Sequence, residues 1–253
     1  MSLYKKMVQE GQTMFRWRSY LPLLLVGPLL LALEQAARVE ALIGDNIEDL
    51  WVLVCFTLSM TGLALRAATV GFVPGSTSGR NTTEQRASVL NVKGLYSTVR
   101  NPLYFGNFII ILGCILSLKV WWLVLIASLV FFIYMERIIL TEEDYLEKKF
   151  GDSYNEWRAR TPVIIPNFKL WEPAEMPFSW KTVLKREYPA LLAIGTFFFF
   201  TEFIVDLFFE KEPFGEWIRE DMIWPVSYAA IVVFCLTLRT LKKHTTFLKV
   251  EGR

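Results

Sequence analysis

Two groups of polar residues flank a pair of short apolar runs in the middle of the chain. The first group reads Gly94-x-Tyr96-x-x-x-Arg100-Asn101-Pro102-x-Tyr104-x-Gly106, and the second contains Glu142, Glu143, Phe150, Gly151, Pro162 and Pro166. Polar groups beside membrane segments are energetically costly unless they serve a function. The pattern therefore predicts that chemistry is done where a membrane hairpin begins and ends.

The start of the hairpin has the chemistry of an anion-binding site. Pro102 suits the first turn of a helix, because that turn needs no backbone donor there. The exposed amides of the turn, with Arg100 just before it, form a natural anion site. Two simpler interpretations stay open: Tyr96 and Tyr104 as interface anchors, and Gly106 as a residue that lets two helices pack closely.

The residues after the hairpin are expected to form one long helix. No Gly or Pro interrupts residues 120–150, so the helix should leave the membrane and continue into the cytosol. At about 100° per residue, one face of this helix holds Glu136, Glu143 and Glu147, and a neighbouring face holds Arg137, Asp144 and Lys148. An exit helix with ordinary salt bridges would show the same pattern.

The amino-acid composition indicates whether the chain folds in water or in a membrane. Its 253 residues are 53% hydrophobic and 15% aromatic, which exceeds the usual apolar share of a soluble domain. We therefore expect an integral membrane protein. The net charge of +2 provides no global basic field for nucleic acid. No obligatory protein partner is implied.

Six apolar segments predict an all-α, polytopic transmembrane protein with about six spans. The segments cover residues 20–33, 50–73, 103–118, 120–135, 189–209 and 222–238. The third and fourth form the tight helical hairpin. With the first, they are at or below the ~17 to 25 residues that cross a ~30 Å hydrocarbon core. Pro22 and Pro28 should bend the first span.

Basic residues gather in the connections on one side of this arrangement. They include Lys5, Lys6, Arg16 and Arg18 at the start, Arg80, Arg86, Lys93 and Arg100 before the hairpin, Lys148, Lys149, Lys185 and Arg186 after it, and Arg239, Lys242, Lys243, Lys249 and Arg253 in the tail. Because cytoplasmic loops carry an excess of Lys and Arg, both termini and the polar ends of the hairpin are predicted to be cytoplasmic.

The chain divides into three segments. Residues 1–85 hold the first two spans and a cytosolic loop, 86–168 hold the hairpin and the cytosolic helix, and 169–253 hold the last two spans and a basic tail. Residues 74–83 are typical of a loop. Within them, Asn81-Thr82-Thr83 matches the glycosylation pattern, which a cytosolic loop would not use.

The sequence contains no pattern typical of a metal site. Cys55, Cys114 and Cys235 all fall inside predicted spans and are interpreted as small apolar residues. The only histidine, His244, lies in the tail, which excludes histidine-centred catalysis within the membrane part.

Three further charged residues lie within predicted spans. Glu202 and Asp206 are four residues apart on one helical face, where they line a substrate or proton path or sit at a wet interface. Arg66, near the inner end of the second span, is expected to snorkel toward the membrane surface.

The ordered set of motifs resembles the integral-membrane methyltransferases, a group that includes isoprenylcysteine carboxyl methyltransferases and phospholipid methyltransferases. The matching residues are Gly94, Tyr96, Arg100, Pro102, Tyr104, Gly106, Arg137, Glu142, Glu143, Leu146, Phe150, Gly151, Tyr154, Pro162 and Pro166. They cover under a third of the chain and make residues 86–168 the methyltransferase-like core. The sequence departs from the family at Asn101, where histidine is usual.

The resemblance implies a cytosolic site for S-adenosylmethionine at the two ends of the hairpin. The residues expected to bind this cofactor are Tyr96, Arg100, Pro102, Tyr104, Gly106, Glu142, Glu143 and Tyr154. Either glutamate would bind the ammonium group or the ribose, and Arg100 the carboxylate. Arg137 is expected to hold the anionic head group of a lipid acceptor, and Asn101 completes the catalytic pair.

The chemistry of Asn101 favours one class of methyl acceptor over another. An asparagine cannot take up a proton near neutral pH. O-methylation of a carboxylate or phosphate on a lipid or lipid-linked group is therefore favoured over N-methylation of a phospholipid amine, which needs a base. A glutamate or a chain of water molecules stays open as that base. Two alternatives of another class stay open: an NADPH-dependent enzyme like the membrane sterol reductases, and a non-enzymatic membrane scaffold or transporter.

Overall fold

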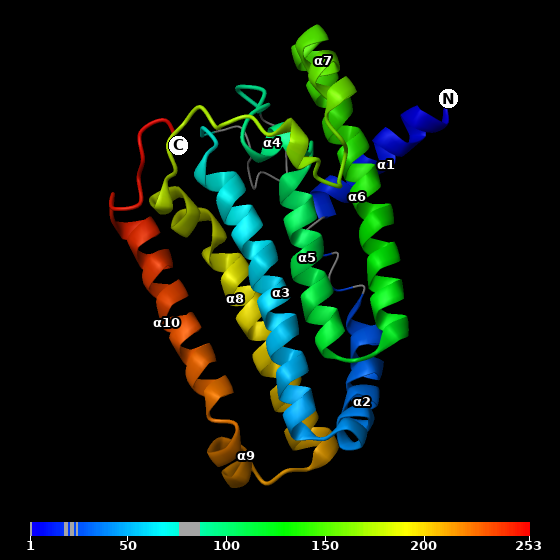
Figure 1. The fold of residues 1–253 in the computed structure, drawn as a ribbon, viewed down its shortest axis with the longest axis vertical. Coiled ribbons are helices and arrows are strands. Elements are labelled where there is room, and N and C mark those ends of the chain that lie inside the picture. The colour runs from blue at the N-terminus through cyan, green and yellow to red at the C-terminus, as the bar shows by residue number, and fades with distance from the viewer. Residues whose placement is uncertain (1, 18–19, 21–22, 24, 76–86) are drawn as a thin grey trace.

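The structure is a bundle of long helices with both chain termini near the same end (Figure 1). A computed structural model describes residues 2–17, 20, 23, 25–75 and 87–253. Within these residues, four helices are long and apolar enough to cross a membrane: α3 (Asp45–Gly71), α6 (Trp121–Phe150), α8 (Trp180–Ile204), which continues into the π-helix η3 (Val205–Glu210), and α10 (Ile223–His244). The prediction of an all-α integral membrane protein is confirmed.

The two remaining expected spans, over residues 20–33 and 103–118, differ from these four helices in length or polarity. Helix α5 (Pro102–Ser117) is apolar but only 16 residues long. Helix α2 (Val26–Ile43) begins later than the first predicted span and continues through polar residues that include Glu34 and Glu40. Pro28 lies in its first turn, where no intrahelical donor is needed, so it removes no hydrogen bond of the helix. The total of six spans stays a prediction.

Shorter helices lie at the two ends of the bundle. They are α1 (Leu3–Trp17), α4 (Leu95–Thr98), α7 (Asp152–Arg160), the 3-10 helix η2 (Phe168–Leu170) and α9 (Phe214–Glu220). Figure 1 shows α4 and α7 at one end, which we call the α7 end, and α9 at the opposite α9 end. The predictions made for Arg18, Pro22, Arg80, Asn81-Thr82-Thr83 and Arg86 lie outside the described residues.

The uninterrupted helix predicted over residues 120–150 is confirmed as α6. Its start is joined to α5 by a short turn in which Lys119 has a left-handed backbone (φ 60°). Its end is Gly151, whose φ of 54° ends the helix and starts α7 in a new direction. A left-handed residue costs little strain when it is glycine.

Small residues let α3 and α5 approach closely. A side chain at Gly62 would place its Cβ 2.7 Å from the carbonyl oxygen of Gly106, and one at Gly113 would overlap Ser59. In membranes, close packing of this kind replaces the hydrophobic effect as the force that joins helices. Cys55, Cys114 and Cys235 are free and buried, as expected.

The N-terminal helix α1 was not predicted. It packs along the later part of α6 through Val8, Gly11 and Phe15, which are buried. The Thr141 hydroxyl donates to the carbonyl of Val8 (3.0 Å), and the Tyr134 hydroxyl donates to that of Met14 (2.5 Å). Val8, Gly11 and Phe15 are spaced so that they share one face of a helix, although basic residues lie nearby in the sequence.

The expectation for Arg66 was wrong. Its guanidinium does not snorkel but forms two hydrogen bonds to Glu187 on α8 (2.7 and 3.0 Å) and one to Asn107 on α5 (2.6 Å). Both charged side chains are largely buried, at 14% and 6% exposure. The carboxylate of Glu187 gives the guanidinium charge-assisted hydrogen bonds inside the bundle, so it does not need to reach the membrane surface. With the bond to Asn107, these contacts join α3, α5 and α8.

The close approach of α3 and α5 can be tested by substitution. Gly62→Val should destabilise the fold by about 1 to 3 kcal/mol, because the added carbons overlap the backbone of α5. Thermal unfolding of the purified protein measures the effect. Gly27→Ala is the matched control, since a Cβ there meets nothing within 4 Å. Equal melting temperatures for the two variants would contradict this packing.

Candidate cofactor site

The two polar groups of the hairpin meet at the α7 end. The Tyr104 hydroxyl, in the first turn of α5, donates to Glu142 on α6 (2.8 Å). One residue further, Glu143 lies 2.7 Å from the guanidinium of Arg100, which precedes α5. These side chains of Arg100 and Glu143 are only 12% and 17% exposed. The hairpin therefore brings together four of the residues expected to bind the cofactor.

Helix α7 closes a third side of this cluster. Gly151 turns the chain back, and Tyr154 on α7 is fully buried. The indole of Trp157 donates to the carbonyl oxygen of Tyr96 (3.0 Å), which fixes α7 against the segment before α5. Arg158 lies over the Tyr154 ring, 5.6 Å from its centre.

Several polar atoms of this cluster are buried without a hydrogen-bond partner among the described residues. They are Nε and Nη1 of Arg100, Oε1 of Glu143, the hydroxyl of Tyr154 and Oδ1 of Asn155. The Arg100–Glu143 contact is thus a charge contact whose atoms are not aligned for hydrogen bonding. An unsatisfied buried group costs about 1 to 3 kcal/mol. Such a concentration of donors and acceptors fits a polar, zwitterionic ligand.

The two tyrosines at this site stay protonated near neutral pH. Burial, followed by the charge of Glu143, raises the pKa of Tyr154 to about 12. Burial, followed by the charge of Glu142, raises the pKa of Tyr96 to about 12 as well. Both phenols are therefore hydrogen-bond donors and not bases at physiological pH.

Asn101 holds the segment after α7 in place. Its side-chain amide donates to the carbonyl of Val163 (3.0 Å), and the backbone amide of Arg100 donates to that of Pro162 (2.8 Å). The backbone amide of Asn167 donates to the carbonyl of Thr98 (2.9 Å). Asn101 thus supports the loop that follows α7, and its part in catalysis stays a prediction.

Arg137 lies where α1 crosses α6. Its guanidinium is 2.8 Å from Glu136 and 3.5 Å from Glu10 of α1, and the side chain is 18% exposed. Five residues separate it from Glu142, which is about 8 Å along the helix axis. The head-group role of Arg137 stays a prediction.

Pro102 and Gly106 have structural roles in α5. Pro102 starts the helix, as its fixed φ favours. Gly106 faces α3, where an added Cβ would lie 2.7 Å from the side chain of Arg66. Contacts of either residue with a cofactor stay predictions.

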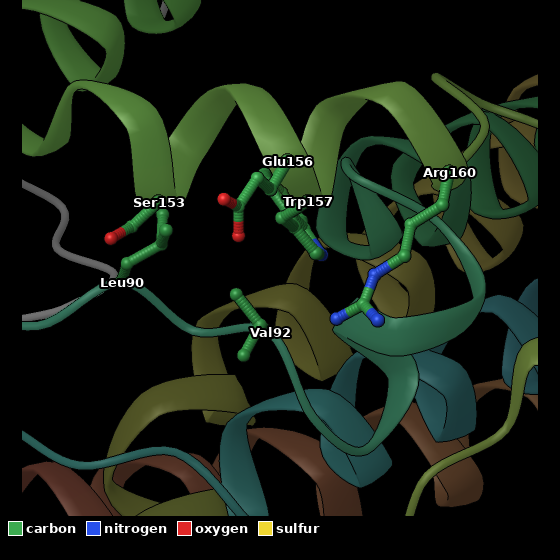
Figure 2. Close-up of a pocket in the computed structure, with 6 residues that line it drawn as sticks. All are labelled: Leu90, Val92, Ser153, Glu156, Trp157 and Arg160. Atoms are coloured by element: carbon green, nitrogen blue, oxygen red, sulfur yellow. The ribbon is translucent and has the colours of Figure 1, made fainter.

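A cavity of about 350 Å³ lies beside α7. Figure 2 shows Ser153, Glu156 and Arg160 of α7 directed toward the segment that holds Leu90 and Val92. Trp157 lines the same cavity, and its ring also contacts Tyr154, with centroids 5.7 Å apart. The cavity therefore adjoins the polar cluster through one aromatic side chain.

Comparisons with known proteins agree with the motifs. Residues 77–153 match the family described as phospholipid methyltransferase. Protein-S-isoprenylcysteine O-methyltransferase of Schizosaccharomyces pombe is 41% identical over 78 residues, 31% of this chain and 33% of the relative. The resemblance to membrane methyltransferases is confirmed. The matched family segment contains Arg100, Tyr104, Glu142 and Glu143, whereas Tyr154 follows it directly.

A second relative has a different description. The nickel-cobalt-cadmium resistance protein NccN of Alcaligenes xylosoxydans xylosoxydans is 31% identical over 127 residues, 49% of this chain and 56% of the relative. The chain thus spans a third to just over half of the length of these curated relatives. No solved structure matches the chain.

Sequence reasoning missed Asn155 and the contribution of α1. Asn155 directly follows the Phe150-Gly151-x-x-Tyr154 pattern, so its place in the first turns of a short helix could have indicated it. Glu10 gave no signal, because its partner Arg137 lies 127 residues later in the chain.

The Arg100–Glu143 contact can be measured with a double-mutant cycle. Arg100→Gln and Glu143→Gln should each destabilise the protein, and the double variant should be less destabilised than the sum of the two single effects, with a coupling of about 1 to 3 kcal/mol. The reason is that each single change leaves a largely buried charge unpaired.

The exposed pair Lys93–Glu175 is the matched control. Its side chains are 43% and 73% exposed, so its coupling should stay between about 0 and 1 kcal/mol. Equal couplings for the two pairs would show that the Arg100–Glu143 contact is an ordinary surface ion pair.

Proposed function

We propose that this protein is an S-adenosylmethionine-dependent methyltransferase that acts on a lipid or lipid-linked acceptor. The observation that carries the proposal is the set of buried polar atoms on Arg100, Glu143, Tyr154 and Asn155 that form no hydrogen bond among the described residues. They lie in, or directly beside, the segment that is similar to membrane methyltransferases.

The residues at the α7 end fit the chemical groups of this cofactor. Arg100, with the first amides of α5, suits the carboxylate. Glu143 and Asn155 offer acceptors for the ammonium group. Glu142 and Tyr104 suit the ribose hydroxyls, and the Tyr154 ring suits the adenine. When bound, the cofactor supplies a methyl group activated by a sulfonium.

The acceptor is an oxyanion in this proposal. Tyr96 and Tyr154 are protonated near neutral pH, and Asn101 is committed to a backbone carbonyl. None of the three can remove a proton from an ammonium group. A carboxylate or phosphate oxygen needs no base, so holding it in line with the methyl group supplies most of the catalysis.

Arg137 would bind the head group of this acceptor. Its charge is balanced by Glu136 and by Glu10, and the Glu10 side chain is 44% exposed. An anionic head group can replace a partner that is already in contact with water. Phe108, Phe131 and Phe132 form an aromatic group on α5 and α6 that adjoins Tyr104 and suits the lipid chain.

Cofactor binding is tested by calorimetry with S-adenosylhomocysteine and with NADPH. We expect the wild-type protein to bind the former alone, and Arg100→Gln and Glu143→Gln to weaken binding at least about tenfold, the effect of losing one charge-assisted hydrogen bond. Lys148→Gln, an exposed change on the same helix as Glu143, is the control and should bind normally. Binding of NADPH alone would point to a reductase and refute the proposal.

Acceptor chemistry is tested with labelled S-adenosylmethionine, using a prenylcysteine analogue, an anionic lipid phosphate and phosphatidylethanolamine in separate assays. We expect either a base-labile methyl ester from the carboxylate of the prenylcysteine analogue or a methyl phosphate ester from the lipid phosphate. Arg137→Gln should lower turnover at least about tenfold while cofactor affinity is unchanged, because its contacts concern the acceptor. A base-stable methylamine as the main product would exclude the oxyanion acceptor.

A further inference from the structure

The Pro-x-x-x-Pro segment of the matching motifs has no part in the proposed function. Pro162 and Pro166 follow α7, and we call residues 162–171 the 162–171 loop. Three hydrogen bonds, described above, hold this loop to residues 98–101, directly before α5. The loop is therefore fixed beside the first turn of α5.

Large apolar side chains of this loop point away from the protein. The exposed fractions are 37% for Val163, 77% for Ile165, 64% for Phe168 and 51% for Trp171. Ile164, between the first two, is turned inward and packs against the apolar cluster between α1 and α6. The loop thus has one anchored side and one exposed apolar side. A concentration of exposed apolar side chains of this kind indicates an interaction surface.

The packing of Ile164 determines the level of the loop along the bundle. The α6 residues of the cluster that it contacts lie between Phe131 and Ile139. Ile133 of α6 is exposed and apolar, whereas Glu136 is the first exposed charged side chain after it. A helix that crosses a bilayer changes from apolar to charged residues where it leaves the hydrocarbon. The loop therefore lies at the level where α6 leaves the membrane.

The other residues of the loop suit a phospholipid surface. Residues 161–171 contain no Asp or Glu, and their one charged side chain, Lys169, is exposed. A lysine at a membrane surface reaches the lipid phosphates with its ammonium group while its aliphatic stem stays in apolar contact. Tryptophan, here Trp171, is enriched at the same depth. Pro162 and Pro166 have no backbone N–H, so neither leaves a donor unsatisfied in an apolar environment.

We propose that the exposed side of the 162–171 loop lies in the head-group region of the phospholipid bilayer, with Val163, Ile165, Phe168 and Trp171 directed toward the lipid. The loop rests on the bilayer and does not cross it, unlike the long helices. Because the loop packs on α6 through Ile164, one lipid surface contacts both elements. This contact is independent of the reaction that the candidate site performs.

The test measures the depth of single residues in a bilayer. Ile165→Cys and Phe168→Cys of the full chain are labelled with a nitroxide and reconstituted into nanodiscs of phosphatidylcholine and phosphatidylglycerol. Electron paramagnetic resonance then gives the accessibility of each label to oxygen, which concentrates in lipid, and to a nickel complex, which stays in water. We expect both labels to favour oxygen and to lie about 5 to 10 Å into the boundary between head groups and acyl chains, the depth of interfacial apolar segments.

Asp152→Cys is the matched control. Asp152 is exposed and follows the end of α6, about 20 Å along the helix axis from Glu136. Its label should favour the nickel complex. The three native cysteines are buried, and labelling of the unsubstituted chain measures their background.

Two results would overturn the proposal. In the first, the two labels in the loop favour the nickel complex as strongly as the control label does, which means that water covers the loop. In the second, the labels in the loop are shielded from both reagents, which means that a second copy of the chain or another protein covers it.

Discussion

The contact between the start of α5 and the later part of α6 is the constraint on which the candidate site depends. Tyr104–Glu142 and Arg100–Glu143 join two segments that are about forty residues apart in sequence. Both contacts require that the hairpin turn at Lys119 sets the correct register between the helices. Once they form, α7 and the loop held by Asn101 can pack around them. The buried polar atoms that form no hydrogen bond among the described residues are then gathered in one place.

The sequence predicted the elements of this site better than their partners. The absence of Gly and Pro predicted α6, and Pro102 predicted the start of α5, because both signals are local. Which glutamate meets Arg100 is not a local property. It depends on the register of the hairpin, which no single residue determines. For the same reason Arg66 was misjudged, since its partner Glu187 lies on a helix 121 residues away.

The first segment of the chain was also hard to predict. The stretch 20–33, which contains Pro22 and Pro28, was interpreted as a span. Helix α2 covers the later part of this stretch and extends to Ile43, so this span stays a prediction. Helix α1 was missed because its buried positions, Val8, Gly11 and Phe15, are few and stand among basic residues. These positions are buried only because α6 offers a surface against which they pack. Tertiary contacts, not intrinsic preference, determine such a helix.

Helix α6 is thirty residues long and has no interruption, so it is a stiff rod of about 45 Å. A straight helix of this kind resists bending, because every turn is held by its own hydrogen bonds. Movement that admits a ligand between α5, α6 and α7 is therefore concentrated at the ends of the rod. Gly151 is the joint at one end, where the backbone can rotate with little steric resistance. In the proposed function, the glycine that ends the helix is the position at which α7 can move relative to α6 to admit the cofactor.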